Sequence, residues 1–263
     1  MQPDDLIDAL ASFRADGLEA LFLGGSHGRG TADAVSDVDL LAIVTPGTEA
    51  VVVARWRHWM EAHTQLVLWR AFGDPPGLIN LITQSWLRCD LSVKHAGALA
   101  RHAQDTLKPL HDPSDHHARL PARYVAPPLD LQKLGRDIEE FTRILGLTSV
   151  VMGRGETLVA QHGAILMRNL LVDMMMADGP PAPPGGLLHL SRSVTPEHYA
   201  TLLELPGPEA VPDSHLAMAD VYFPLARRVA ARCDAPWPDD FIAATRAHLL
   251  SALGKTFGLP PEA

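Results

Sequence analysis

The side chains best suited to chemistry lie within the first 90 residues of the sequence. Ser26 lies in the glycine-rich stretch 24–30 (GGSHGRG), and eleven residues after it Asp37 and Asp39 flank the start of an apolar segment, 38–44. Residues i and i+2 of a strand project to the same face, so the two carboxylates are expected together, about 7 Å apart at the backbone. Hard oxygen ligands in this arrangement suit Mg²⁺, which proteins hold through one or two carboxylates together with substrate phosphates.

A third acid lies in the middle of a later apolar segment. In residues 87–94 (LRCDLSVK) the apolar side chains alternate, which places Asp90 on the other face with Arg88, Ser92 and Lys94. An acid at the centre of a strand is unfavourable by propensity. Completing a metal site, or acting as general base toward an acceptor hydroxyl, would account for it. An ion pair with Arg88 or Lys94 is the simpler alternative.

Taken together, these residues predict phosphoryl transfer. Two Mg²⁺ ions about 4 Å apart can clamp the attacking and leaving oxygens of an in-line displacement. The backbone N–H groups of the turn at Gly25 and the Ser26 hydroxyl would approach the β- and γ-phosphates of a triphosphate. Arg29 would add a charge-assisted contact. Each feature alone is also typical of an ordinary loop or a solvated strand, and their order along the chain favours a site.

Helix-like and strand-like segments alternate around these residues, which indicates that the N-terminal half of the chain is α/β in character. Helices are expected at about 4–16 and 48–62, and strands at about 20–23, 38–44, 66–70, 78–83 and 87–94. Residues 108–128 are dense in Pro, Asp and His and lack periodicity, which marks a domain boundary.

Beyond this boundary the apolar spacing becomes helical. Helices are expected at about 131–145, 156–177, from 196, 213–233 and 238–253, with a loop at 179–186. The helix at 156–177 is expected to bury Leu158, Ile165, Leu166, Leu170 and Met174. The expected plan is a catalytic domain at 1–115, a linker at 116–128 and an acceptor-binding helical bundle at 129–263.

Composition limits the classes of partner. The 263 residues contain 22 Lys+Arg and 31 Asp+Glu, a net charge of −9, which disfavours a broad nucleic-acid surface. Cys89 and Cys233 are too few for a disulfide framework or a Cys-rich zinc site. The N-terminus lacks the apolar core of a signal peptide, and no apolar run approaches about 18 residues. These features predict a cytoplasmic protein with no membrane span.

The ordered set Gly25-Ser26, Asp37-Val38-Asp39 and Asp90 resembles the nucleotidyltransferase superfamily of DNA polymerase β-like enzymes. The two-domain plan is similar to that of the lincosamide and aminoglycoside antibiotic adenylyltransferases. The resemblance implies an α+β fold, in which a polymerase β-like domain with a mixed sheet is followed by a C-terminal helical bundle. It also implies that Asp37 and Asp39 hold Mg²⁺, that Gly25 and Ser26 hold the triphosphate, and that Asp90 is metal ligand, general base or both.

The function that follows is Mg²⁺-dependent transfer of a nucleoside monophosphate, taken as AMP from ATP or another nucleoside triphosphate, to a hydroxyl of a small acceptor. A lincosamide or aminoglycoside antibiotic is the expected acceptor, and a homodimer is compatible with the apolar helices. Two alternatives stay open: AMP transfer to a protein or tRNA, as in toxin-neutralising members, and a non-catalytic nucleotide-sensing module. Charged side chains of the bundle that could contact substrate are Arg136, Glu139, Glu140, Glu156 and Arg168.

Overall fold

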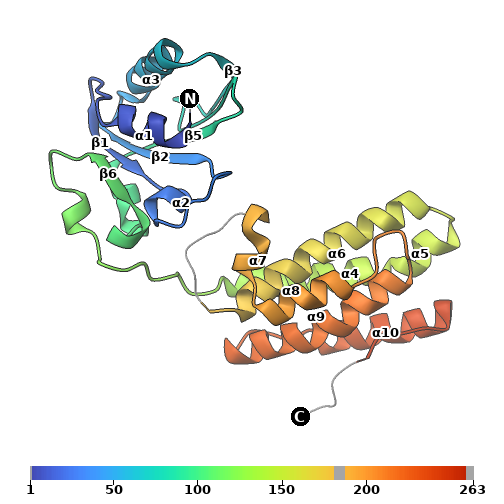
Figure 1. The fold of residues 1–263 in the computed structure, drawn as a ribbon. Helices are drawn as coiled ribbons and strands as arrows, with labels where there is room; N and C mark the ends of the chain where they lie inside the picture. Colours follow the sequence, from blue (N-terminus) through green and yellow to red (C-terminus); the bar gives the residue numbers. More distant parts are fainter. Residues whose placement is uncertain (1, 181–186, 259–263) are drawn as a thin grey trace. The chain divides into compact units, whose positions relative to one another are not determined.

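The chain divides into two compact units, Met1–Val125 and Ala126–Ala263 (Figure 1). The computed structural model describes residues 2–180 and 187–258. Most of the loop expected at 179–186 therefore lies outside the described residues. Each unit has its own hydrophobic core.

The N-terminal unit contains a six-stranded sheet in the order β3-β4-β5-β2-β1-β6. Its strands are β1 (Leu18–Leu23), β2 (Val38–Val44), β3 (Leu66–Phe72), β4 (Leu78–Thr83), β5 (Arg88–Lys94) and β6 (Lys108–His111). β2 and β5 pair in parallel, and the other neighbours pair antiparallel. With a mixed sheet in one unit and helices in the other, the fold is α+β, as the sequence predicts.

The two faces of the sheet are covered differently. The helices α1 (Pro3–Leu10) and α3 (Glu49–His63) pack with Val38, Leu40 and Leu91 in the main core of the unit. On the opposite face, Leu41 and Ile43 contact Leu99 and Leu107, which belong to the segment leading to β6. Because side chains alternate along a strand, Asp39 lies on the same face as Leu41 and Ile43.

Helix α1 is shorter than the expected 4–16 and ends at Leu10. The chain turns there, with the backbone N–H of Phe13 donating to the carbonyl of Leu10 at 3.0 Å. This turn places the Phe13 ring edge-on to Trp56, with their centroids 5.3 Å apart. Contact with the aromatic residues of α3 therefore outweighs continuation of the helix.

The segment without periodicity is more ordered than its composition predicts. Residues 108–111 form β6, which pairs with β1 through Leu23↔Lys108. Downstream, the backbone N–H of Tyr124 donates to the Asp105 carboxylate at 2.9 Å. The boundary between the two units follows Val125, inside the range expected as a linker. Local patterning misses β6 because the strand is short and contains a proline, as edge strands tolerate.

The C-terminal unit is helical. Its helices are α4 (Leu131–Gly146), α5 (Thr148–Gly153), α6 (Thr157–Asp178), α7 (Leu190–Ser193), α8 (Pro196–Glu204), α9 (Asp213–Arg232) and α10 (Asp239–Leu253). Within this unit, α6 packs along α9 and α4 along α10 (Figure 1). Thr195 caps α8, because its hydroxyl accepts the N–H of His198 at 3.2 Å. No helix in the described part of the chain has the length and apolarity to cross a membrane.

The buried face of α6 differs from the prediction. Leu158, Ile165 and Leu166 are exposed, whereas Met174 is buried as expected. The helix is apolar on most sides, so hydrophobic periodicity does not identify its core face. The residues that face the core are Ala160, Ala164, Met167, Leu171, Val172, Met174 and Met175. A side chain at Gly163 would meet the His215 ring at 3.4 Å, so small residues set the close approach of α6 to α9.

Candidate active site

The glycine-rich turn is built against Asp39. The backbone N–H of Gly24 donates to the backbone carbonyl of Asp39 at 2.8 Å, which joins the end of β1 to β2. Gly25 then adopts a φ of +53° and opens the short helix α2 (Gly25–Gly28). A Cβ at Gly25 would overlap the Asp39 carboxylate oxygen Oδ2. Only glycine allows both this backbone conformation and this close approach.

Ser26 and Arg29 belong to the same turn. Ser26 is buried, and its backbone carbonyl accepts the N–H of Thr31 at 2.9 Å. The first backbone bond of α2 is made by Gly28, whose N–H donates to Gly24 at 2.6 Å. The preceding N–H groups, at Gly25, Ser26 and His27, come before the first intrahelical bond of the turn and can donate to an anion.

A tight turn before β2 presents Asp37. The Asp33 N–H donates to the Ser36 hydroxyl at 2.9 Å, and that hydroxyl donates to the Asp33 carboxylate at 3.0 Å. A side chain that closes its own backbone turn in this way holds a loop in one conformation. Asp37 follows directly, with about a third of its side chain exposed. The turn at 33–36 has no counterpart among the sequence-based predictions.

The parallel pairing of β2 and β5 brings Asp39 and Asp90 together. The register places Asp39 directly beside Asp90, with Val38 beside Cys89 and Leu40 beside Leu91. Neighbouring strands lie about 4.8 Å apart, so side chains at paired positions are adjacent on one face. Asp37, Asp39 and Asp90 thus all belong to the sheet face opposite α1 and α3.

Two further polar residues border the acids. Arg88 pairs with Asp37, with Nη1 at 3.4 Å from Oδ2, and not with Asp90 as one alternative held. On β4, Asn80 lies opposite Asp90 in the antiparallel register. Asn80 is the single polar residue between apolar neighbours in 78–82 (LINLI), and that interruption is the signal by which it could have been identified.

The site carries more negative than positive charge, because Asp37, Asp39 and Asp90 outnumber Arg29 and Arg88. Burial, and then the charges of Asp37 and Asp90, raise the pKa of Asp39 to about 6, although Arg29 and Arg88 act in the opposite direction. The charges of the three acids also affect the thiol of Cys89, which lies on the other face of β5. Burial raises the pKa of its thiol, and the charges of Asp90, Asp39 and Asp37 raise it further. Like charges held together in this way favour a bound cation.

The donor set fits Mg²⁺ better than a closed metal cage. Within residues 2–180 and 187–258, no three Asp, Glu, His or Cys side chains are already arranged around a single metal position. Mg²⁺ keeps several waters and takes one or two carboxylates plus phosphate oxygens, so an open set of carboxylates is compatible with it. Asp37, directly before β2, and Asp39, on β2, could hold such an ion with Asp90 beside them.

The His- and Asp-rich segment is not part of this site. His111 belongs to β6, and Asp112 accepts the backbone N–H groups of His116 and His117 at 3.0 and 2.8 Å. This short network orders the loop after β6.

A mixed sheet with acids on adjacent parallel strands and a glycine turn against them defines the site of this chain. No known family model and no curated protein sequence matches the chain. Among solved structures it is similar to an aminoglycoside 6-adenyltransferase from Bacillus subtilis, with 11% identity, coverage of 93% of this chain and 95% of that one, and a TM-score of 0.39.

Two other solved structures align over most of the chain. The CCA-adding enzyme of Thermotoga maritima, complexed with tRNA, is 13% identical over 97% of this chain and 71% of that one, with a TM-score of 0.34. A nucleotidyltransferase-like protein from Exiguobacterium sibiricum is 13% identical over 95% of this chain and 87% of that one, with a TM-score of 0.33. Similarity at this level does not assign an activity.

Proposed function

We propose that this protein is a Mg²⁺-dependent nucleotidyltransferase that transfers a nucleoside monophosphate, AMP from ATP in the first instance, to a hydroxyl of a small acceptor and releases pyrophosphate. The observation that carries the proposal is the register that sets Asp39 beside Asp90, with Gly25 packed on the Asp39 carboxylate. A purely structural sheet gains nothing from burying unneutralised acids at this position.

Each part of the site has a distinct task in the proposed reaction. The N–H groups of the turn and the buried Ser26 hydroxyl hold triphosphate oxygens, and the Arg29 guanidinium offsets their charge. Asp37 and Asp39 hold Mg²⁺, which supplies charge neutralisation at the reacting phosphate. Asp90 accepts the proton of the acceptor hydroxyl or completes the metal site. Arg88 keeps Asp37 oriented when no substrate is bound.

The test is pyrophosphate release in the presence of Mg²⁺, with each of the four ribonucleoside triphosphates and a panel of hydroxylated acceptors that includes lincosamides and aminoglycosides. Release is expected only with an acceptor present and only with intact Asp37 and Asp39. Asp16→Asn is a matched control, because Asp16 is an exposed acid of the same unit. Equal turnover by Asp37→Asn, Asp39→Asn and the control would contradict the proposed mechanism.

Labelled ATP separates small acceptors from macromolecules. Incubation with cell lysate followed by gel filtration is expected to leave the label on small molecules. Label retained on protein or tRNA would show that the acceptor is a macromolecule and not a small molecule. Nucleotide binding without pyrophosphate release under any condition would instead favour a sensing module.

A further inference from the structure

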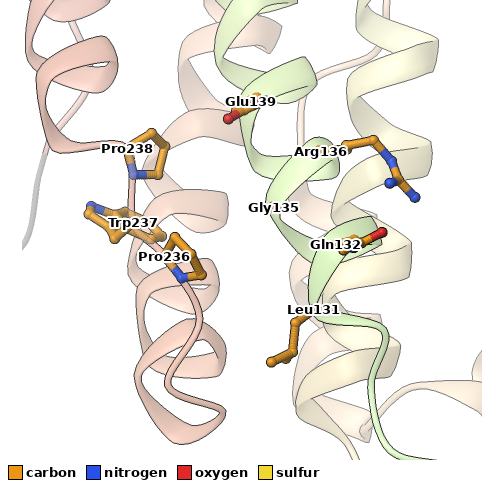
Figure 2. A pocket seen from close by; sticks show the side chains of 8 residues that line it. All are labelled: Leu131, Gln132, Gly135, Arg136, Glu139, Pro236, Trp237 and Pro238. Atoms are coloured by element: carbon orange, nitrogen blue, oxygen red, sulfur yellow. The ribbon is translucent and has the colours of Figure 1, made fainter.

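The helical unit contains an open groove, and none of the residues assigned to the proposed catalytic site lines it. It lies between the first turns of α4 and the segment joining α9 to α10, and its volume is about 630 Å³ (Figure 2). Its lining residues are Leu131, Gln132, Gly135, Arg136, Glu139, Pro236, Trp237 and Pro238. A volume of this size falls in the range of small-molecule sites.

One wall of the groove is apolar and consists of the segment Pro236–Trp237–Pro238. Trp237 is half-buried between Pro236 and Pro238, two residues that restrict the backbone on both sides of it. The guanidinium of Arg227 lies over the Trp237 ring, 6.0 Å from its centroid. A tryptophan held in this way offers a rigid surface for stacking and for contact with a cation.

The opposite wall is open at Gly135. This glycine lies inside α4, and a Cβ built on it would meet nothing within 4 Å. No positive φ requires glycine here, and glycine in a helix interior is destabilising relative to alanine. Its effect is to remove a side chain from the wall that faces the tryptophan segment, which leaves room for a ring.

Glu139 supplies an unpaired charge. Within the part of the chain that the structure describes, no ion pair involves this exposed carboxylate, whereas its neighbour Glu140 is bonded to Arg143 at 2.7 Å. Figure 2 shows the Glu139 carboxylate directed toward the segment that carries Trp237, while the Arg136 side chain extends to the other side of α4. Of the two charged lining residues, Glu139 is therefore the one whose side chain extends toward Trp237.

We propose that this groove binds a small organic molecule that carries one amine and one flat apolar ring. The ring lies against Trp237 over Gly135, and the ammonium group pairs with Glu139. The single free carboxylate and the two arginines nearby, Arg136 and Arg227, favour one positive charge over several. This binding is independent of nucleotidyl transfer.

The experiment follows the indole N–H signal of Trp237 in the full-length ¹⁵N-labelled protein. Trp237→Phe identifies that signal by its loss. Three probes with the same ring and different charge are titrated at pH 7: 2-phenylethylamine, neutral 2-phenylethanol and anionic 3-phenylpropanoate. The amine is expected to shift the Trp237 signal with a millimolar Kd, as suits its size, and the anion to bind at least about tenfold more weakly.

Variants separate the charge from the shape of the groove. Glu139→Gln is expected to bring the three Kd values to within about twofold of one another, whereas Glu140→Gln keeps the preference for the amine. Gly135→Phe fills the groove and is expected to weaken all three probes at least about tenfold. Circular dichroism checks its helical content, and the two surface variants decide the charge assignment whether or not this third variant folds.

Three results overturn the proposal. They are a Trp237 signal that no probe shifts, an anion that binds as tightly as the amine, and identical behaviour of Glu139→Gln and Glu140→Gln. Asp39→Asn should leave the Kd values unchanged. Groove binding without any nucleotidyl transfer would count against the catalytic proposal alone, and transfer without groove binding would count against the groove alone.

Discussion

Two groups of carboxylates, one in each unit, meet opposite electrostatic surroundings. In the helical unit, Asp178 accepts from Arg228 at 3.3 and 2.9 Å, and its side chain is only 15% exposed. The Arg228 bonds, with His198 and Arg232 nearby, lower the pKa of Asp178. In the N-terminal unit, burial and two neighbouring acids raise the pKa of Asp39 to about 6. Asp178 is thus paired with cations inside its unit, whereas no ion pair involves Asp39 in the described part of the chain.

The largest expected effect comes from removing the charge of Asp39. Asp39→Asn should reduce pyrophosphate release by roughly 10³-fold, because the proposed site loses a negatively charged ligand for Mg²⁺ while the shape of the side chain is kept. The same variant should be more stable than wild type in EDTA, since it removes a desolvated charge that its neighbours repel. Thermal unfolding in EDTA and steady-state turnover in Mg²⁺ measure the two effects.

A loss of stability in Asp39→Asn would contradict the comparison between the two groups. It would mean that Asp39 is held by partners inside the fold, as Asp178 is. Asp16→Asn, in the same unit, is expected to change neither quantity.

Gly25→Ala should have the next largest effect. The added methyl group would overlap the Asp39 carboxylate, and alanine disfavours the φ of +53° at this position. Displacing a reacting group by about 1 Å can reduce turnover by about 10². We expect kcat to fall by that order, with nucleotide affinity measured in parallel by calorimetry. An unchanged kcat would show that Gly25 is needed only for the backbone conformation of the turn and not for the position of the Asp39 carboxylate.

The paired carboxylate should matter for stability and not for turnover. Asp178→Asn replaces charge-assisted bonds to Arg228 and is expected to lower the free energy of unfolding by about 1.5–3 kcal/mol. Asp173→Asn is the control on the same helix, since Asp173 is 46% exposed and pairs with an exposed lysine, Lys133. Asp173→Asn should lower the free energy of unfolding by less than about 1 kcal/mol. Equal losses in the two variants would mean that burial of Asp178 contributes nothing.

We expect Asp178 and His215 to contribute to the pH dependence of the stability of the helical unit. The pKa of Asp178 is lower in the folded protein, so its stabilisation is present above the ordinary value of 3.8 and is lost as the pH falls through the folded value. Burial lowers the pKa of His215, so stability should decrease as the pH falls below 6.5.

The His215 ring has specific partners. It bonds the Thr148 hydroxyl at 2.7 Å through Nδ1 and the Ala160 carbonyl at 3.1 Å through Nε2. Its protonation would remove the acceptor that the Thr148 hydroxyl uses. Denaturant unfolding between pH 7.5 and pH 5 is expected to show a smaller decrease in His215→Gln than in wild type. A parallel decrease in both proteins would assign the pH dependence to other groups.

The N-terminal site was the part most open to prediction from sequence. Strand alternation alone identifies the face of Asp39 and of Asp90, and β2 and β4 have the bounds that their apolar runs predict. Pairing of Arg88 with Asp37 could not be predicted, because it depends on the parallel register of β2 and β5. That register is a contact between residues about 50 positions apart, and no local pattern encodes it.

In the helical unit, the secondary structure was easier to predict from the sequence than the packing of its side chains. The positions of the longer helices follow from the sequence pattern, whereas the short helices α5 and α7 were not predicted. The buried face of α6 was not predicted either, since both sides of that helix are apolar and close packing at Ala160 and Ala164 decides its orientation. The groove was also missed. Gly135 and Trp237 are separated by about 100 residues, and each is unremarkable within its own segment.

The smallest expected effect contrasts Gly135 with Gly25. Gly135→Ala adds a methyl group to open space in the middle of α4, so no contact opposes it. Alanine should therefore raise the free energy of unfolding by about 0.5–1 kcal/mol through helix propensity, measured by denaturant unfolding. Glycine at position 25 is required by its neighbours, whereas at position 135 it costs stability that the fold does not need to lose. A decrease in stability would contradict the open space beside Gly135 and, with it, the shape proposed for the groove.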